Sequence, residues 1–153
     1  MTLAIIETKR TLPYAPADLC ALVSDIRAYP RFIPWLKRID VLRERTEEGT
    51  WIAVARADVG WRALSERFTT EVRAAQNRID VALVEGPFKR LENRWRFLQA
   101  PGGETLVDFY VAFEFRNPIL QALATLNREI AAGRIMAAFE QEAARRFAKR
   151  PTA

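Results

Sequence analysis

The fold of this chain is decided by residues 105–116, which read TLVDFYVAFEFR. Apolar and polar side chains alternate along this stretch, so that Val107 and Phe115 fall on one face and Asp108 and Glu114 on the other. A period of two is typical of a strand with one buried face. So apolar a face predicts a sheet that another layer of the protein must cover.

Similar alternating stretches precede this one and are separated by turn signals. Together they predict a meander of antiparallel strands, in which the apolar positions of neighbouring strands share one face. The expected strands are residues 3–12, 37–47, 50–59, 61–73, 78–84 and 91–98, with turns at Glu48-Gly49, Gly60, Gly86-Pro87 and Pro101-Gly102-Gly103.

The segment after residue 116 supplies the cover. Asn117 is a favoured N-cap residue, Pro118 suits the first helical position, and no further proline occurs before residue 149, which predicts one long helix. Gly133 marks a place where this helix approaches the sheet closely or bends. The apolar positions expected to face the sheet are Ile119, Leu123, Leu126, Ile130, Ile135, Met136, Phe139, Ala143 and Phe147.

A short aromatic segment, Tyr29-Pro30-Arg31-Phe32-Ile33-Pro34-Trp35, follows a helix expected over residues 15–25. Each proline fixes its own φ and biases the residue before it, Tyr29 or Ile33, away from the α region. The segment is therefore predicted to be a stiff elbow that holds large side chains in place. Two interpretations stay open, since these rings either form the wall of an apolar binding site or plug the core.

The predicted fold is α+β: a curved antiparallel sheet of about seven strands wrapped around a long C-terminal helix, with two short helices after the first strand. Residues 1–150 are expected to form one domain and residues 151–153 a disordered tail. A helix is about 10 Å across, narrower than the concave face of a curled sheet, so space is left between them. Periodicity does not decide whether side chains fill that space.

Composition restricts the chemistry. The chain has no histidine, one cysteine (Cys20) and a net charge of +5, and it carries no phosphate-binding glycine motif. We therefore expect no metal site, no cofactor, no internal disulfide and no catalytic residue, in a cytoplasmic protein without signal peptide or membrane span. Glu66 is the one carboxylate suspected inside the sheet, with Asn93 as its partner; the competing interpretation pairs Glu66 with Arg56 or Arg94.

Four stretches together resemble the START-like (helix-grip) superfamily, and within it the ubiquinone-binding, polyketide cyclase-like branch that includes coenzyme Q-binding proteins and ribosome-associated toxins. The resemblance spans nearly the whole chain. The stretches are Val23–Trp35, Glu66–Val72, Gly86–Phe97 and Val107–Arg116 leading into the last helix.

This resemblance implies non-catalytic binding of ubiquinone, or a similar prenylated lipid, between sheet and helix, in support of ubiquinone delivery or function in respiration. Such pockets are mostly apolar. The residues expected to line it are Tyr29, Phe32, Pro34, Trp35, Leu64, Phe68, Trp95, Phe97, Phe109, Val111, Phe113, Leu123, Met136 and Phe139.

Two other functions stay open: a regulator or toxin that binds the large ribosomal subunit, and a polyketide cyclase or aromatase. DNA is not an expected partner. For delivery, the protein would touch the anionic inner face of the cytoplasmic membrane, and the cations expected to make that contact are Arg145, Arg146, Lys149 and Arg150. The competing interpretation is a solvated helix end.

Overall fold

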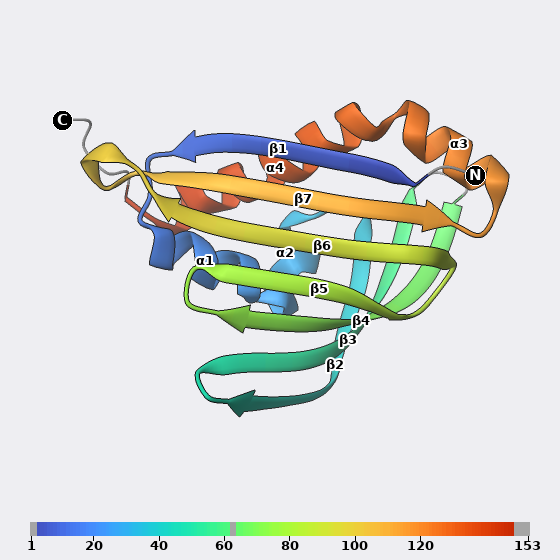
Figure 1. Cartoon of the computed structure of the whole chain (residues 1–153), viewed down its shortest axis with the longest axis horizontal. Coiled ribbons are helices and arrows are strands. Elements are labelled where there is room, and N and C mark those ends of the chain that lie inside the picture. The colour runs from blue at the N-terminus through green and yellow to red at the C-terminus, as the bar shows by residue number, and fades with distance from the viewer. Residues whose placement is uncertain (1–2, 62–63, 149–153) are drawn as a thin grey trace.

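Seven antiparallel strands form a single curved sheet, as predicted (Figure 1), and their order in it is β1-β7-β6-β5-β4-β3-β2. The computed structural model describes residues 3–61 and 64–148, so the expected tail at 151–153 lies outside the described residues. The strands are β1 (Ala4–Leu12), β2 (Leu36–Glu47), β3 (Thr50–Trp61), β4 (Leu64–Ala75), β5 (Arg78–Glu85), β6 (Phe88–Gln99) and β7 (Thr105–Phe115).

Helices lie on one side of this sheet. In Figure 1 the strands from β5 to β1 are in front, and the helices α1, α2 and α4 lie behind them. Because α4 packs on the concave side, the alternating apolar residues of the strands are buried beneath it. The helical elements are α1 (Pro16–Ser24), η1 (Ile26–Ala28), α2 (Tyr29–Phe32), η2 (Pro101–Gly103), α3 (Pro118–Leu126) and α4 (Arg128–Arg146).

The register confirms the predicted apolar face. Phe109 of β7 lies opposite Trp95 of β6, which lies opposite Ile79 of β5, which in turn lies opposite Ala74 of β4. Directly opposed residues share a face of a sheet, so these side chains form a row across the concave side. All four are buried.

The C-terminal cover is two helices, which corrects the expectation of one. α3 ends at Asn127, whose φ of −102° and ψ of 12° leave the helical region and whose side-chain amide donates to the carbonyl of Leu123 at 2.8 Å. An asparagine side chain that bonds to a backbone carbonyl of the preceding turn competes with helix continuation. Gly133, where a bend was considered, lies inside α4 without a break.

α3 also presents a different face from the one expected. Its buried residue is Gln121, whose Oε1 accepts from the backbone N–H of Phe115 at 2.8 Å. The predicted apolar positions Ile119, Leu123 and Leu126 are exposed instead. The amide of Gln121 satisfies the backbone at the end of β7, and this polar requirement sets the rotation of the helix.

The aromatic elbow contains a short helix, contrary to the expectation for Tyr29. Tyr29 has φ −51° and ψ −44°, in the α region, whereas Ile33 is extended as predicted, with φ −112° and ψ 99°. The Tyr29 hydroxyl donates to the carbonyl of Val23, and its ring contacts Phe32 and Phe139. These tertiary contacts outweigh the local bias of a residue before proline.

Truncation of Phe139 in α4 should destabilise the fold strongly. The rings of Tyr29, Phe32 and Trp95 lie 5.1–5.4 Å from its ring, so Phe139→Ala leaves a cavity and should lower the free energy of unfolding by about 3–5 kcal/mol. Denaturant titration measures this. Leu126→Ala, at an 80% exposed position, is the control and should change it by less than about 0.5 kcal/mol. Equal effects of the two changes would contradict this packing.

Candidate binding site on the concave face

Burial on the concave face changes along the strands. Near the start of β7 the inward side chains are fully buried, with Val107 and Ile79 each 1% exposed, whereas Val111, further along β7, is half-buried. We name two regions accordingly. The closed half comprises Val72, Ile79, Trp95, Phe97, Val107 and Phe109, and the open half comprises Val59, Phe68, Leu83, Leu91, Val111 and Phe115.

Interlocked rings fill the closed half. Trp95 lies at its centre, edge-on to Phe109 with ring centroids 4.6 Å apart and edge-on to Phe139 of α4 at 5.1 Å. Phe139 is also in edge contact with Phe32 at 5.4 Å. Edge-to-face contacts at these distances are favourable and leave little room for a ligand. The closed half is therefore packed core.

A second ring cluster borders the open half. Phe88 stacks on Phe115 with centroids 4.4 Å apart and meets Phe68 edge-on at 5.6 Å. The turn before Phe88 fits only a glycine, because a Cβ on Gly86 would lie 2.5 Å from the Cβ of Phe68. The Gly86-Pro87-Phe88 motif thus brings the β5–β6 turn down onto β4 and sets Phe88 beside Phe68.

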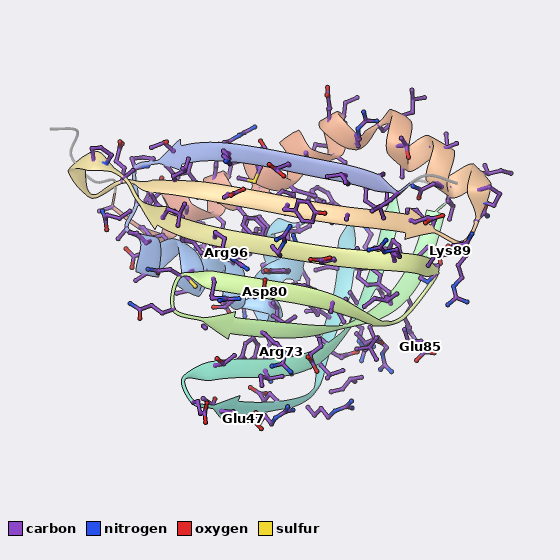
Figure 2. The ribbon with its side chains drawn as sticks, viewed as in Figure 1. Glu47, Arg73, Asp80, Glu85, Lys89 and Arg96 are labelled. Carbon is purple, nitrogen blue, oxygen red and sulfur yellow. The ribbon has the colours of Figure 1, made fainter. Side chains whose placement is uncertain are left out.

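A depression lies beside the open half, on the convex side of the sheet. β5 pairs with β6 from Arg78 to Ala82, and beyond this point the two strands part. The depression has a volume of about 580 Å³, its lining is mostly polar and includes Glu71, Arg73, Asp80, Glu92 and Arg94, and Leu83 and Leu91 lie at its border. Figure 2 shows Glu85 and Lys89 on the two strands at this end of the sheet.

One polar side chain lies at the boundary of the two halves. Asn93 of β6 accepts a hydrogen bond at 3.0 Å from the indole N–H of Trp95, and its amide donates to the carbonyl of Tyr110 at 2.9 Å. An amide NH₂ has two donors, so Asn93 retains a second N–H for another acceptor. It is suited to orient a carbonyl-bearing ligand in an apolar site.

Glu66 lies near the start of β4, directly opposite Val59 of the open half, and it is half-buried. The two arginines considered as its partners contact other carboxylates, Arg56 that of Asp40 and Arg94 that of Glu92, each at 3.6 Å. Asn93, the other residue considered beside it, is engaged with Trp95 and Tyr110. The arrangement therefore does not supply an acid–base pair.

The predicted lining residues separate into groups. The packed closed half holds seven of them: Tyr29, Phe32, Trp95, Phe97, Phe109, Met136 and Phe139. The open half is lined by Phe68 and Val111, and Phe113 adjoins it through a ring contact with Phe115. Trp35 is half-buried at the start of β2, but Pro34 is exposed. Leu123 is 54% exposed on α3. The side chain of Leu64 lies outside the described residues.

Sequence reasoning did not assign Val59, Leu83, Leu91, Phe88 and Phe115 to the site. Leu83 and Phe115 have the strand phase of their apolar neighbours, which is a usable signal. Leu91 likewise has the strand phase of Trp95 and Phe97, whereas Phe88 is concealed by a register shift between Phe88 and Arg90, which breaks the alternation of β6. A bulge of this kind cannot be placed from periodicity alone.

The basic end of α4 is tied into the protein. Arg145 Nε and Arg146 Nε donate to the buried carboxylate of Glu142 at 2.9 and 2.7 Å, and Arg146 also contacts Asp25 at 3.1 Å. Arg146 is only 22% exposed. Lys149 and Arg150 lie outside the described residues. Arg146 therefore joins α4 to Asp25, the residue between α1 and η1, and has little contact with solvent, whereas Arg145 pairs with Glu142 of its own helix and is 67% exposed.

The described part of the chain shows neither a cluster of metal-binding side chains nor a helix able to cross a membrane. Among residues 3–61 and 64–148, no three histidine, cysteine or carboxylate side chains lie close enough together to hold a metal ion. No helix in this part of the chain has the length and apolar character needed to cross a bilayer.

A curved seven-stranded sheet around a C-terminal helical segment, with apolar residues on its concave side, defines the helix-grip class. Residues 12–140 match the family described as polyketide cyclase / dehydrase and lipid transport. The chain belongs to this family, in agreement with the START-like resemblance of its sequence.

Three relatives place the chain more closely. It is 30% identical over 139 residues to the ribosome association toxin RatA of Rickettsia prowazekii, covering 88% of this chain and 92% of that one. It is 28% identical over 137 residues to the mitochondrial coenzyme Q-binding protein coq10 of Schizosaccharomyces pombe, covering 88% and 83%. An 18 kDa protein of Caulobacter crescentus, solved in solution, is 39% identical with a TM-score of 0.76, covering 94% and 96%.

The ion pairs of Glu142 with Arg145 and Arg146 should make the free energy of unfolding depend on pH below neutrality. The hydrogen bond from Arg145, together with that from Arg146, lowers the pKa of the Glu142 carboxyl to about 2. In the unfolded chain this pKa is about 4.3, so the stabilisation is complete above that value and is lost as pH falls toward 2. Glu142→Gln should therefore lower the free energy of unfolding at pH 7 and approach wild type near pH 2.

Chemical denaturation of both proteins across pH 2–7 measures this difference. Glu129→Gln, which removes an exposed carboxylate from the first turn of the same helix, is the control and should show a smaller effect. A wild-type advantage that stays constant from pH 7 to pH 2 would show that the ionised Glu142 carboxylate does not stabilise the fold.

Proposed function

We propose that this protein binds ubiquinone, or a similar prenylated lipid, in the open half of the concave face and does not transform it. The observation that carries the proposal is the change in burial along the strands. The same apolar face that is sealed by interlocked rings in the closed half has half-buried aliphatic and aromatic side chains in the open half. A mostly apolar recess with few polar groups suits such a ligand.

The head group of a quinone is a flat ring with two carbonyl oxygens, and the open half offers contacts for both features. Phe68, Phe88 and Phe115 provide ring faces and edges, and offset stacking contributes about 0.5–1.5 kcal/mol per aromatic pair beyond burial. The second N–H of the Asn93 amide is the donor that we assign to one carbonyl oxygen. An isoprenoid tail requires only apolar surface.

The side chains available support binding without a reaction. The sequence contains no histidine, which is the usual general base near neutral pH. Glu66 lies beside Val59 of the open half, and the amide of Asn93 is engaged with Trp95 and Tyr110. We therefore propose binding, for the delivery or function of ubiquinone in respiratory electron transport. The name of the coenzyme Q-binding relative of Schizosaccharomyces pombe supports this choice.

A ribosome-associated regulator is the second candidate, favoured by the name of the Rickettsia prowazekii relative and by the net charge of +5. Many cations of the convex face are, however, paired with carboxylates. Arg96 contacts Asp80 at 2.9 Å and Arg73 contacts Glu71 at 2.8 Å (Figure 2). Pairing weakens the positive field that attracts RNA phosphates.

The ribosomal candidate has a direct test. We expect the purified protein to leave large ribosomal subunits during sedimentation once salt reaches about 0.2 M, because unspecific phosphate contacts weaken steeply with salt. Co-sedimentation that persists at this salt concentration would favour the ribosomal candidate. The measurement is the fraction of protein in the pellet, with bovine serum albumin as the unbound control.

Filling the open half should block quinone binding without unfolding the protein. Leu83→Trp adds bulk where the recess is proposed, so it should weaken ubiquinone binding at least about tenfold while the free energy of unfolding changes by less than about 1 kcal/mol. Val84→Trp is the matched control, because Val84 is the next residue of β5 and is 53% exposed. It should bind like wild type.

Binding is measured in detergent, by titration calorimetry and by quinone recovered after gel filtration. If Leu83→Trp binds as tightly as Val84→Trp, the ligand does not occupy this recess. If Leu83→Trp lowers the free energy of unfolding by about 1–3 kcal/mol, as overpacking of a filled core does, the open half is not a recess. If the wild-type protein binds no quinone, the proposed function is wrong.

A further inference from the structure

A stripe of large apolar side chains on α3 and the first turn of α4 faces solvent. We call this set the α3 stripe; its exposed fractions are 71% for Ile119, 54% for Leu123, 80% for Leu126 and 56% for Ile130. Ile119, Leu123 and Leu126 follow one another on α3 at steps of four and three, so they form one ridge, and Ile130 lies in the first turn of α4 just beyond Asn127. Scattered single apolar residues are normal on a protein surface, but a contiguous ridge marks an interaction site.

The orientation of this ridge is fixed by the fold. On the inner side of α3, Gln121 accepts from the backbone of Phe115, and Ala124 packs against the core. Turning the ridge inward would bury Leu123 and Leu126 but would remove Gln121 from the end of β7. The buried hydrogen bond of Gln121 therefore fixes the orientation of α3 in which the ridge is exposed.

The charge around the ridge is positive. Residues 116–134 contain three arginines and one glutamate, and residues 117–127 contain no charged side chain. Arg116 and Arg128, at the two ends of α3, are exposed and donate to the backbone carbonyls of Phe88 and Thr125. Their charges therefore flank the apolar stripe and face neutral oxygen atoms in these contacts.

We propose that the α3 stripe docks this protein onto an anionic lipid bilayer. A helix with an apolar ridge and flanking arginines lies in the plane of a membrane interface, with the ridge among the acyl chains and the guanidinium groups at lipid phosphates. This surface lies at the opposite end of the protein from Arg145 and Arg146, the cations that the sequence had suggested for membrane contact (Figure 1).

A bilayer fits the α3 stripe better than a second copy of the chain does. A two-fold contact through the stripe would bring the same basic residues of both copies together, and like charges would oppose the contact. The stripe also lies close in the chain to the open half, because α3 follows directly on the end of β7, where Phe115 lies. Docking there gives a lipid a route between bilayer and recess; this role rests on the proposed function, whereas the docking itself does not.

The experiment compares vesicle flotation of four proteins on phosphatidylglycerol/phosphatidylcholine vesicles and on pure phosphatidylcholine vesicles. Wild type should float with the anionic vesicles. Leu126→Ser combined with Ile130→Ser should lower the partition coefficient at least about tenfold. Arg116→Gln combined with Arg128→Gln should remove the preference for anionic vesicles. Leu98→Ser is the control for exposed apolar surface, since Leu98 is 48% exposed at the other end of the sheet, and it should float like wild type.

Three outcomes overturn the docking proposal: no flotation of wild type, equal flotation of wild type and the Leu126→Ser/Ile130→Ser protein, or a wild-type dimer in light scattering that this double variant converts to a monomer. Quinone binding in detergent is measured on the same proteins and should be unchanged in the double variant. Flotation without quinone binding would refute the proposed function alone. Quinone binding without flotation would refute the docking surface alone.

Discussion

The helix that covers the sheet is shorter than the strands beneath it, and this mismatch shapes the whole molecule. α4 has 19 residues and β7 has 11, which correspond to lengths of about 28 Å and about 37 Å. α4 therefore seals one end of the concave face, where Phe139 reaches Trp95, and leaves the other end to the shorter α3. The closed half, the open half and the exposed α3 stripe all follow from this arrangement.

Two kinds of interaction hold the C-terminal helices to the sheet. Ring contacts around Phe139 hold α4 to the sheet without polar groups, whereas α3 is attached mainly through the amide of Gln121 at the end of β7. The first interaction buries a large apolar area, and the second satisfies backbone groups that would otherwise lose a hydrogen bond. Because this attachment is polar, the apolar side chains of α3 stay exposed. We propose that they insert into a lipid bilayer.

The sequence predicted the sheet and its inward face well, because the alternation in residues 105–116 and 78–84 is a local property that burial preserves. It failed where a polar contact decides the outcome. The rotation of α3 depends on Gln121 meeting the backbone of Phe115, and the helix break depends on Asn127 bonding to Leu123, neither of which periodicity reveals. For the site, the sequence correctly predicted that the aromatic residues share one face of the sheet. It did not predict the division of that face into packed and open halves, because this depends on the length of α4.

We propose that a flat ligand lies in the open half and not among the rings of the closed half. Nuclear Overhauser effects between ubiquinone protons and labelled methyl groups of the protein, recorded in detergent, locate the ligand directly. We expect contacts from the head group to the methyls of Leu83, Leu91 and Val111, and none to the buried Ile79 or Val107. Head-group contacts confined to the surface residues Ile119 and Leu126, or contacts with Ile79 and Val107, would contradict it.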